Sequence, residues 1–204
     1  MPNYLLKYGT KTLILPVILI LIGIYFKKLY LIVIALLILV FLYNFYRIPI
    51  INVLTDTRVI TAPTFGRVQK VDRINNNIYI SIFLSPFDPH IQYMPYNGYL
   101  VDTIYKTGTF KPAFLFKKSI HNERMIYNIQ TNLGMISVVQ IAGIMARRIS
   151  SFVTPNNKYL KGHKIGMIHF GSRVDIIIPY MTGMKIYVKK GTYVKGPETP
   201  LIQL

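Results

Sequence analysis

Hydrophobic residues are unevenly distributed along the chain. Residues 13–26 and 29–43 are apolar runs separated by Lys27 and Lys28, whereas later apolar residues alternate with polar ones in short stretches. Each run is shorter than the roughly 20 residues that a helix needs to cross a bilayer. A single continuous helix would place both ammonium groups at mid-membrane, which is costly. The pattern therefore predicts a membrane-anchoring helical hairpin within residues 1–49, with the lysines at its tip reaching toward a headgroup layer.

Two kinds of membrane contact fit this hairpin: two short tilted spans, or a shallow re-entrant hairpin. Either leaves both ends on one side of the membrane. Basic residues flank the hairpin, and the positive-inside rule then predicts a membrane protein whose globular domain lies on the cytoplasmic face. A cleaved signal peptide is disfavoured, because no small-residue cleavage site follows the first apolar run.

Residues 50–204 predict one β-rich domain, so the expected fold class is α+β, mostly β. Stretches rich in Ile, Val and Tyr indicate strands at residues 57–62, 67–72, 78–83, 123–131, 135–140 and 184–188, the last of them the final strand. Residues 75–77, all Asn, favour a turn, because Asn tolerates a positive φ. Residues 132–134 predict a second hairpin, and residues 141–149 indicate a short helix.

Two further strand-like stretches, residues 164–170 and 173–178, flank Gly171 and Ser172. A glycine at this place indicates a β-hairpin with a bulged turn. The pair also permits a chemical interpretation, because glycine has no side chain to block attack of the serine hydroxyl on its carbonyl. The amide would become an ester, and elimination would break the chain and leave a pyruvoyl group in place of Ser172. That reaction needs a base and a distorted peptide.

The charge balance predicts an anionic partner. The 204 residues contain 24 Lys and Arg against 7 acidic residues, a net charge of +17. A membrane surface or a nucleic acid fits this balance. The sequence has no helix-turn-helix, zinc-finger or RNP-like motif, so we expect the membrane and no nucleic acid. The absence of Cys excludes a disulfide framework and a thiolate nucleophile, and the four His have no metal-site spacing.

Four motifs in order resemble those of the phosphatidylserine decarboxylases. They are Ser85-Pro-Phe-Asp-Pro-His90, Asn122-Glu-Arg124, Gln140-Ile-Ala-Gly-Ile-Met-Ala-Arg-Arg-Ile149 and Lys161-Gly-His-Lys-Ile-Gly-Met-Ile-His-Phe-Gly-Ser-Arg-Val-Asp-Ile-Ile-Ile-Pro179. The chain is most similar to the short, single-domain form of this family, which includes archaetidylserine-decarboxylase-like proteins. The resemblance implies a compact lipoyl-like β-sandwich over residues 50–204, preceded by the hairpin.

The resemblance also implies a function. A proenzyme would cut itself between Gly171 and Ser172 into residues 1–171 and 172–204, with Ser172 becoming the pyruvoyl cofactor and with no metal. The pyruvoyl carbonyl would form a Schiff base with the amine of phosphatidylserine and withdraw electrons as carbon dioxide leaves. The product would be phosphatidylethanolamine, and another serine-headgroup lipid remains an alternative anionic phospholipid substrate. A homo-oligomer is left open.

The same resemblance assigns roles to individual residues. His90 would place the substrate carboxylate or move a proton, because imidazole titrates near neutral pH. Arg147 or Arg148 would bind the anionic headgroup, because a guanidinium holds a phosphate or carboxylate with two parallel hydrogen bonds. The remaining histidines are expected to be structural, His169 among them.

Two positions depart from the family pattern. The family usually has Pro-x-Asp-Gly near the start of the domain, whose Asp takes part in self-cleavage, and here Phe65 occupies the place of that acid. The long form also has a second His where this chain has Tyr93, a place at which the short form already departs. Asp88 or Asp175 is a candidate replacement for the acid. The alternative function is therefore a processing-deficient, non-catalytic membrane protein that binds lipid.

Overall fold

The structure, a computed structural model, describes residues 4–113, 115, 116, 119–144, 148–169 and 172–204. It divides into two compact units, Met1–Ile50 and Ile51–Leu204. The helices of the first unit are α1 (Leu5–Tyr8), the 3-10 helix η1 (Thr10–Leu13), α2 (Ile14–Tyr25) and α3 (Leu29–Phe45).

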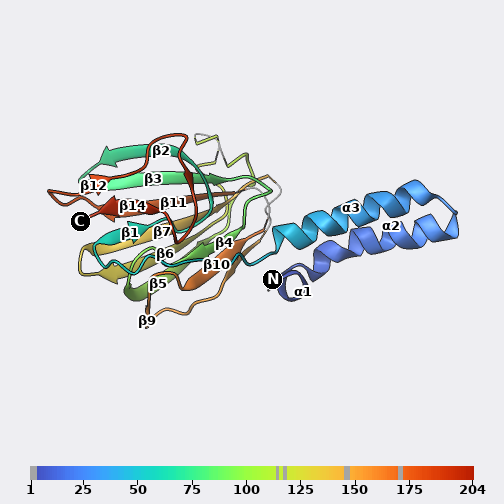
Figure 1. Ribbon diagram of the computed structural model, residues 1–204, viewed down its shortest axis with the longest axis horizontal. Helices are drawn as coiled ribbons and strands as arrows, with labels where there is room; N and C mark the ends of the chain where they lie inside the picture. The colour runs from blue at the N-terminus through green and yellow to red at the C-terminus, as the bar shows by residue number, and fades with distance from the viewer. Residues whose placement is uncertain (1–3, 114, 117–118, 145–147, 170–171) are drawn as a thin grey trace. The chain divides into compact units, whose positions relative to one another are not determined.

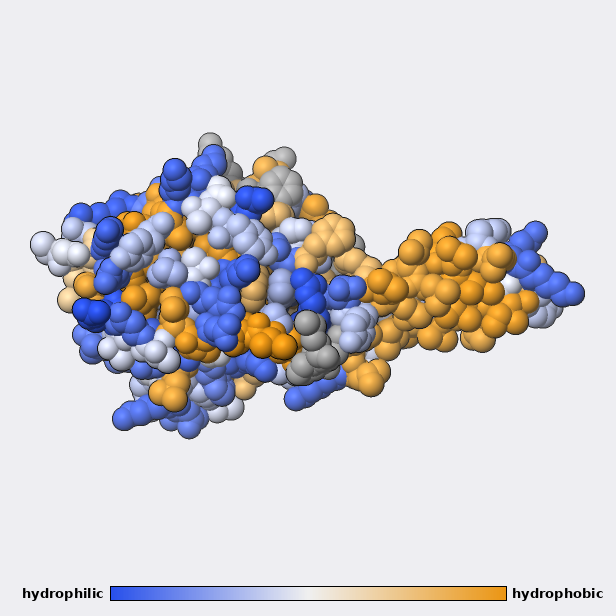
Figure 2. Space-filling model, viewed as in Figure 1, coloured by the Kyte–Doolittle hydropathy of each residue, from blue (hydrophilic) through white to orange (hydrophobic). Residues whose placement is uncertain are grey.

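Helices α2 and α3 run antiparallel and form the predicted helical hairpin (Figure 1). Lys27 turns the chain between them with a φ of 51°. Gly23 allows close helix packing, because a Cβ there would lie 2.7 Å from Cγ1 of Ile32. The visible surface of both helices is hydrophobic, whereas the tip of the hairpin is hydrophilic (Figure 2). In the described part of the chain, no helix is both long enough and apolar enough to cross a membrane.

The described strands of the second unit form three antiparallel sheets. The large sheet has the order β13 (Tyr193–Val194), β2 (Gly66–Ile74), β3 (Asn77–Leu84), β11 (Ser172–Pro179), β7 (Gly134–Ala142), β6 (Arg124–Thr131), β5 (Gly98–Lys106) and β9 (Asn157–Tyr159). One small sheet has the order β4 (Ile91–Tyr93), β10 (Lys164–Ile168) and β8 (Ile149–Ser151). The other has the order β1 (Val59–Thr61), β14 (Pro200–Gln203) and β12 (Lys185–Ile186). The unit is therefore mostly β, as predicted.

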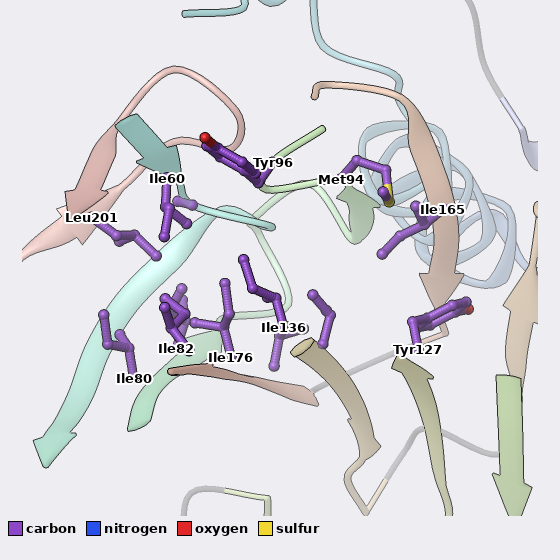
Figure 3. Close-up of a cluster of buried hydrophobic side chains, with 14 of the residues drawn as sticks. Ile60, Ile80, Ile82, Met94, Tyr96, Tyr127, Ile136, Ile165, Ile176 and Leu201 are labelled. Carbon is purple, nitrogen blue, oxygen red and sulfur yellow. The ribbon is translucent and has the colours of Figure 1, made fainter. Parts of the chain in front are cut away.

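The hydrophobic core lies between the large sheet and the small ones. Every second side chain of β3 and β11 is fully buried, as the two-residue period of a strand requires. Figure 3 shows Ile80 and Ile176 of the large sheet pointing toward Ile60 and Leu201 of the sheet β1-β14-β12. Burying one such aliphatic side chain stabilises the fold by about 1.5–3 kcal/mol, so this face fixes the register of the central strands.

The hairpins predicted around residues 75–77 and 132–134 are confirmed. Asn75 and Asn76 adopt φ angles of 48° and 59° between β2 and β3. Both values are positive, as the favoured two-residue turn of a β-hairpin requires. In the second hairpin, Thr131 of β6 pairs with Gly134 of β7.

Three local predictions are wrong. Strands β10 and β11 belong to different sheets, so residues 164–178 do not form a hairpin. Residues 141–149 are not one helix, because Ile141 lies in β7, which ends at Ala142, and Ile149 begins β8. The strand predicted at residues 184–188 is shorter, because β12 covers only two residues, and it is not the final strand, because β13 and β14 follow it. In each case the local pattern was satisfied by a long-range partner strand, which short-range propensity does not indicate.

The three central strands of the large sheet have counterparts in a small sheet. The large sheet contains the neighbours β3-β11-β7, and the small sheet has the order β4-β10-β8. In the chain, β3 leads to β4, β7 leads to β8 and β10 leads to β11, so both sheets have the same neighbour order. We call these three connections the strand break. Three of the four sequence motifs overlap the strand break. Residues from distant motifs therefore lie at the same end of the large sheet.

Candidate active site

Ser172 begins β11 at the strand break. It pairs with Leu84 at the end of β3 and with Ala142 at the end of β7. Its side chain is fully buried, and among the described residues its Oγ has no hydrogen-bond partner. Leaving a buried hydroxyl unsatisfied costs about 1–3 kcal/mol, so this atom calls for a functional explanation. Gly171, the other half of the expected cleavage site, lies outside the described residues.

Asp175 lies on the opposite face of β11 from Ser172. Side chains alternate along a strand, so Ser172 and Val174 share the core face while Arg173 and Asp175 share the other. The guanidinium of Arg173 donates from Nε to Oδ1 of Asp175 at 2.9 Å and from Nη2 to Oδ2 at 3.0 Å. This geometry argues against Asp175 as a replacement for the missing acid.

His90 is fully buried at the edge of the small sheet that faces the strand break. Its Nδ1 lies 2.7 Å from the carbonyl oxygen of Asp88. A carbonyl only accepts hydrogen bonds, so Nδ1 carries the hydrogen and Nε2 is the basic nitrogen of the neutral ring. The carbonyl of His90 accepts a hydrogen bond from the backbone of Ile168 at 3.2 Å. Ile168 precedes Ser172 by four residues, which limits their Cα separation to about 14 Å.

Asp88 closes the loop that precedes His90. Its Oδ2 accepts a hydrogen bond from the backbone N of Ser85 at 2.8 Å, and its Oδ1 accepts one from the hydroxyl of Tyr193 at 2.7 Å. The carboxylate therefore shapes the loop and connects it to β13. It has a structural explanation that does not involve Ser172.

Phe65 stands directly before β2 and is buried. At the next residue, Gly66, φ is +140° and a Cβ would lie 2.1 Å from the carbonyl oxygen of Phe83, so only glycine fits. The backbone N of Tyr93 donates to the carbonyl of Pro63 at 2.8 Å, which places this segment against β4. The position of the expected acid is thus apolar and close to the strand that follows His90.

A chain of buried polar side chains supports His90. The hydroxyl of Tyr127 donates to Oε1 of Gln140 at 2.9 Å, and Nε2 of Gln140 donates to Oε1 of Gln92 at 2.5 Å. Nε2 of Gln92 then donates to the carbonyl of His90 at 2.9 Å. Burial raises the pKa of Tyr127, so its hydroxyl stays a donor. Gly166 leaves room for the Tyr127 hydroxyl, because a Cβ at this position would lie 2.7 Å from it.

Asn122 joins the β5–β6 connection to the strand end beside Ser172. Its Nδ2 donates to the carbonyls of Lys111 and Ala142, both at 2.7 Å. Its Oδ1 accepts hydrogen bonds from the backbone N of Lys111 at 3.0 Å and from Oγ1 of Thr109 at 3.1 Å. All four hydrogen-bonding positions of the amide are used, which explains why an Asn is needed there.

Arg173 is a site residue that the sequence analysis missed. Besides Asp175, its Nη1 donates at 2.9 Å to the carbonyl of Ala113 and at 2.9 Å to Oγ of Ser119. The guanidinium also lies over the ring of Phe116, 4.5 Å from its centroid. The residue after Ser172 therefore holds the β5–β6 connection in place. The only signal in the sequence was its position within the fourth motif.

Arg148 and His169 lie at the strand break, whereas Arg147 lies outside the described residues. Arg148 is exposed, and its carbonyl accepts a hydrogen bond from the backbone N of His169 at 3.0 Å. Burial, and then the charge of Arg148, lower the pKa of His169 to about 4. His169 is therefore neutral at pH 7. Its Nε2 lies 3.0 Å from Oγ of Ser150. In the described part of the chain, no three His, Cys, Asp or Glu gather as metal ligands.

Comparison with known proteins gives consistent matches. A sequence model of the family described as phosphatidylserine decarboxylase matches residues 38–201. The phosphatidylserine decarboxylase proenzyme of Carboxydothermus hydrogenoformans is 39% identical over 163 residues, which cover 76% of this chain and 76% of that protein. The proenzyme of Chlorobium phaeobacteroides is 35% identical over 168 residues, 79% of this chain and 78% of that protein. The proenzyme of Nitrosomonas eutropha is 36% identical over 167 residues, 78% of this chain and 76% of that protein. The family match extends from within α3 to β14, so it includes the whole strand break.

Proposed function

The chain belongs to the phosphatidylserine decarboxylase family, and we propose that it converts phosphatidylserine into phosphatidylethanolamine and carbon dioxide after cutting itself between Gly171 and Ser172. As a member of this family it is a carboxy-lyase. The observation that carries the proposed cleavage is the buried Oγ of Ser172, which has no hydrogen-bond partner among the described residues. Ser172 begins β11, where the chain passes from one sheet to another.

The sheet topology fits a self-cut protein. Residues 172–204 supply β11 to β14, and β11 lies between β3 and β7 in the large sheet. β14 lies between β1 and β12, and β13 pairs with β2. A cut before Ser172 would therefore leave the two chains joined by backbone hydrogen bonds and by core residues such as Ile176. The pyruvoyl group, at the first residue of β11, would supply an electron-withdrawing carbonyl as carbon dioxide leaves.

The chain's own residues would bind the substrate and move protons. We assign proton transfer to Nε2 of His90, because its Nδ1–H is directed to the carbonyl of Asp88. The exposed Arg148 would bind the anionic headgroup, and Arg147 is its alternative. Because Ser172 and His90 are both fully buried, water would be largely excluded from the reacting atoms.

Self-cleavage in this chain would have to proceed without an acid at position 65. Asp88 and Asp175 are engaged elsewhere, so we assign the role of base to His90 in this step too. The relatives are proenzymes by name, which favours a cleaved enzyme over the non-catalytic alternative.

The remaining assignments extend this proposal. Residues 1–49 would be the membrane anchor, and residues 50–204 would be the decarboxylase domain, with a lipoyl-like sandwich as its finer description. The domain would lie on the cytoplasmic face. The choice between phosphatidylserine and another serine-headgroup lipid, and a homo-oligomeric assembly, stay predictions.

The test is the intact mass of the detergent-extracted protein, followed by an assay of carbon dioxide release from phosphatidylserine. We expect two chains that separate between Gly171 and Ser172, with a blocked small chain, and measurable turnover. The Ser172→Ala protein should remain one chain without activity. Ser81→Ala, a buried serine on the neighbouring strand β3, is the matched control. A single intact wild-type chain without turnover would overturn the proposal and favour lipid binding alone.

A further inference from the structure

Three large apolar side chains stand exposed on the connections around Ser172. Phe87 is 76% exposed, Ile120 61% and Ile144 56%. Phe87 follows the end of β3, and Ile144 follows the end of β7, the two strands that pair with Ser172. Ile120 precedes Asn122, whose amide is bonded to the carbonyl at the end of β7. We call Phe87, Ile120 and Ile144 the apolar rim.

The loop that carries Phe87 is fixed by hydrogen bonds within it and from β13. The backbone N of Phe87 lies 3.4 Å from Oγ of Ser85, and Asp88 accepts hydrogen bonds from Ser85 and Tyr193. Single exposed apolar residues are ordinary on protein surfaces. Three of them on three connections, at the same end of the sheet as a buried candidate nucleophile, are better explained by a shared apolar partner.

A basic groove lies beside the rim. Its volume is about 430 Å³, and Ile120 is one of its lining residues. The other lining residues are Lys106, Thr107, Gly108, Thr109, His121, Asn122 and Arg124. Lys106 and Arg124 give the groove its positive charge, Thr107 adds a hydroxyl, and the lining includes no acid. Nε and Nη2 of Arg124 already donate to backbone carbonyls, so its contribution is mainly its charge. The groove therefore complements an anionic surface.

We propose that the apolar rim enters the interfacial layer of an anionic phospholipid bilayer, while the basic groove binds headgroup phosphates. Apolar side chains next to cationic ones are typical of surfaces that bind such bilayers, and the net charge of +17 favours the same partner. The residues of this contact belong to the second unit and are not those of the α2–α3 hairpin. Its consequence for catalysis rests on the proposed function: the rim would hold Ser172 at the depth of the lipid headgroups.

The chain contains no Trp, so one substitution provides a local fluorescent probe. The full-length Phe87→Trp protein would be reconstituted into vesicles of phosphatidylglycerol and phosphatidylcholine, with and without acyl-chain-brominated lipid. We expect a blue-shifted emission that the brominated lipid quenches. Ile74→Trp is the matched control, because Ile74 is 45% exposed and lies at the opposite end of the large sheet from Ser172. Its emission should stay unquenched.

Ile144→Trp provides a second probe if Phe87→Trp fails to fold, and it should behave in the same way. Equal emission and quenching for the rim probe and the Ile74→Trp control would overturn the proposal. Quenching that is as strong in purely zwitterionic vesicles would overturn the role of the groove. The fluorescence does not depend on turnover, so loss of the proposed decarboxylase function would leave this test intact.

Discussion

The rings of Phe65 and Tyr93 pack edge to face, with centroids 6.3 Å apart and an interplanar angle of 63°. Phe65 occupies the place of the family's usual acid, and Tyr93 that of the second His of the long form. The position of the family's acid and the position of the long form's second His, at which the short form already departs, are thus joined here by one aromatic contact. Both side chains are buried, and such a pair contributes about 0.5–1.5 kcal/mol beyond its burial.

Restoring the acid alone should therefore fail. Phe65→Asp would bury a carboxylate beside the ring of Tyr93, and a buried charge left without its partner costs about 3–5 kcal/mol. We expect a lower melting temperature in detergent and no faster self-cleavage. Phe87→Asp, the same change at an exposed position, should alter the melting temperature little. A Phe65→Asp protein of unchanged stability that cleaves faster would contradict this prediction.

The paired change should behave differently. Phe65→Asp with Tyr93→His would place a carboxylate opposite an imidazole, at the place of one aromatic contact. We expect the double variant to be more stable than the sum of the single changes, with a coupling of about 0.5–3 kcal/mol, the range for residues in contact. Thermal melting of all four proteins measures this coupling. Simple additivity would show that the two positions do not act as a unit.

His90 should be needed for turnover and not for folding. In His90→Asn the amide nitrogen can still donate to the carbonyl of Asp88, but no group remains to carry a proton. We expect an almost unchanged melting temperature, a single uncleaved chain by intact mass because His90 is also the proposed base of self-cleavage, and a loss of carbon dioxide release of at least 10²–10⁴-fold, roughly the usual contribution of a general acid–base. His163→Asn, at an exposed position, is the control. A loss smaller than about tenfold would remove His90 from the proton-transfer role.

His169 should make the fold less stable in acid. Its pKa is lowered from 6.5 to about 4, so between these pH values the unfolded chain binds a proton that the folded chain does not. Stability therefore falls as the pH drops through this range, by up to roughly 3 kcal/mol. His169→Gln should flatten the fall of the melting temperature between pH 6.5 and 4. His121→Gln, at an exposed position, should leave it as it is, and equal slopes in both variants would refute the assignment.

Local sequence patterns predicted the hairpins but not the way in which the strands combine. The Asn75 turn was predictable because its backbone angles depend on neighbouring residues alone. The separation of β10 and β11 was not, because each satisfies its hydrogen bonds with strands from distant parts of the chain. A Gly171–Ser172 pair between two strand patterns reads as a hairpin turn, and only the sheet order reveals a crossing between sheets.

The candidate site was predictable in part for the same reason. His90 and Ser172 were named from their motifs, and the structure describes both as buried. The polar chain through Gln92 and Gln140 has no local signature, because its members come from different sheets. Asp175 was named only as a candidate for the missing acid, because proximity to Ser172 in sequence does not reveal the face of the strand on which a side chain lies.

Arg173 provides the last test, because it links the residue after Ser172 to a distant connection. Its guanidinium donates hydrogen bonds to the carboxylate of Asp175, to the carbonyl of Ala113 and to Oγ of Ser119. A lysine keeps the charge but has a single nitrogen, so Arg173→Lys should lose the contacts to the β5–β6 connection.

Arg173→Lys should destabilise the protein by about 2–3 kcal/mol, in line with the loss of hydrogen bonds to a charged group. Protease sensitivity should rise within residues 107–122, and self-cleavage should slow, because Asn122 ties the same connection to the end of β7 beside Ser172. Arg67→Lys, at an exposed position of β2, is the matched control. If both variants show the same melting temperature and the same protease pattern, Arg173 does not hold this connection, and the integrity of the site must depend on Asn122 instead.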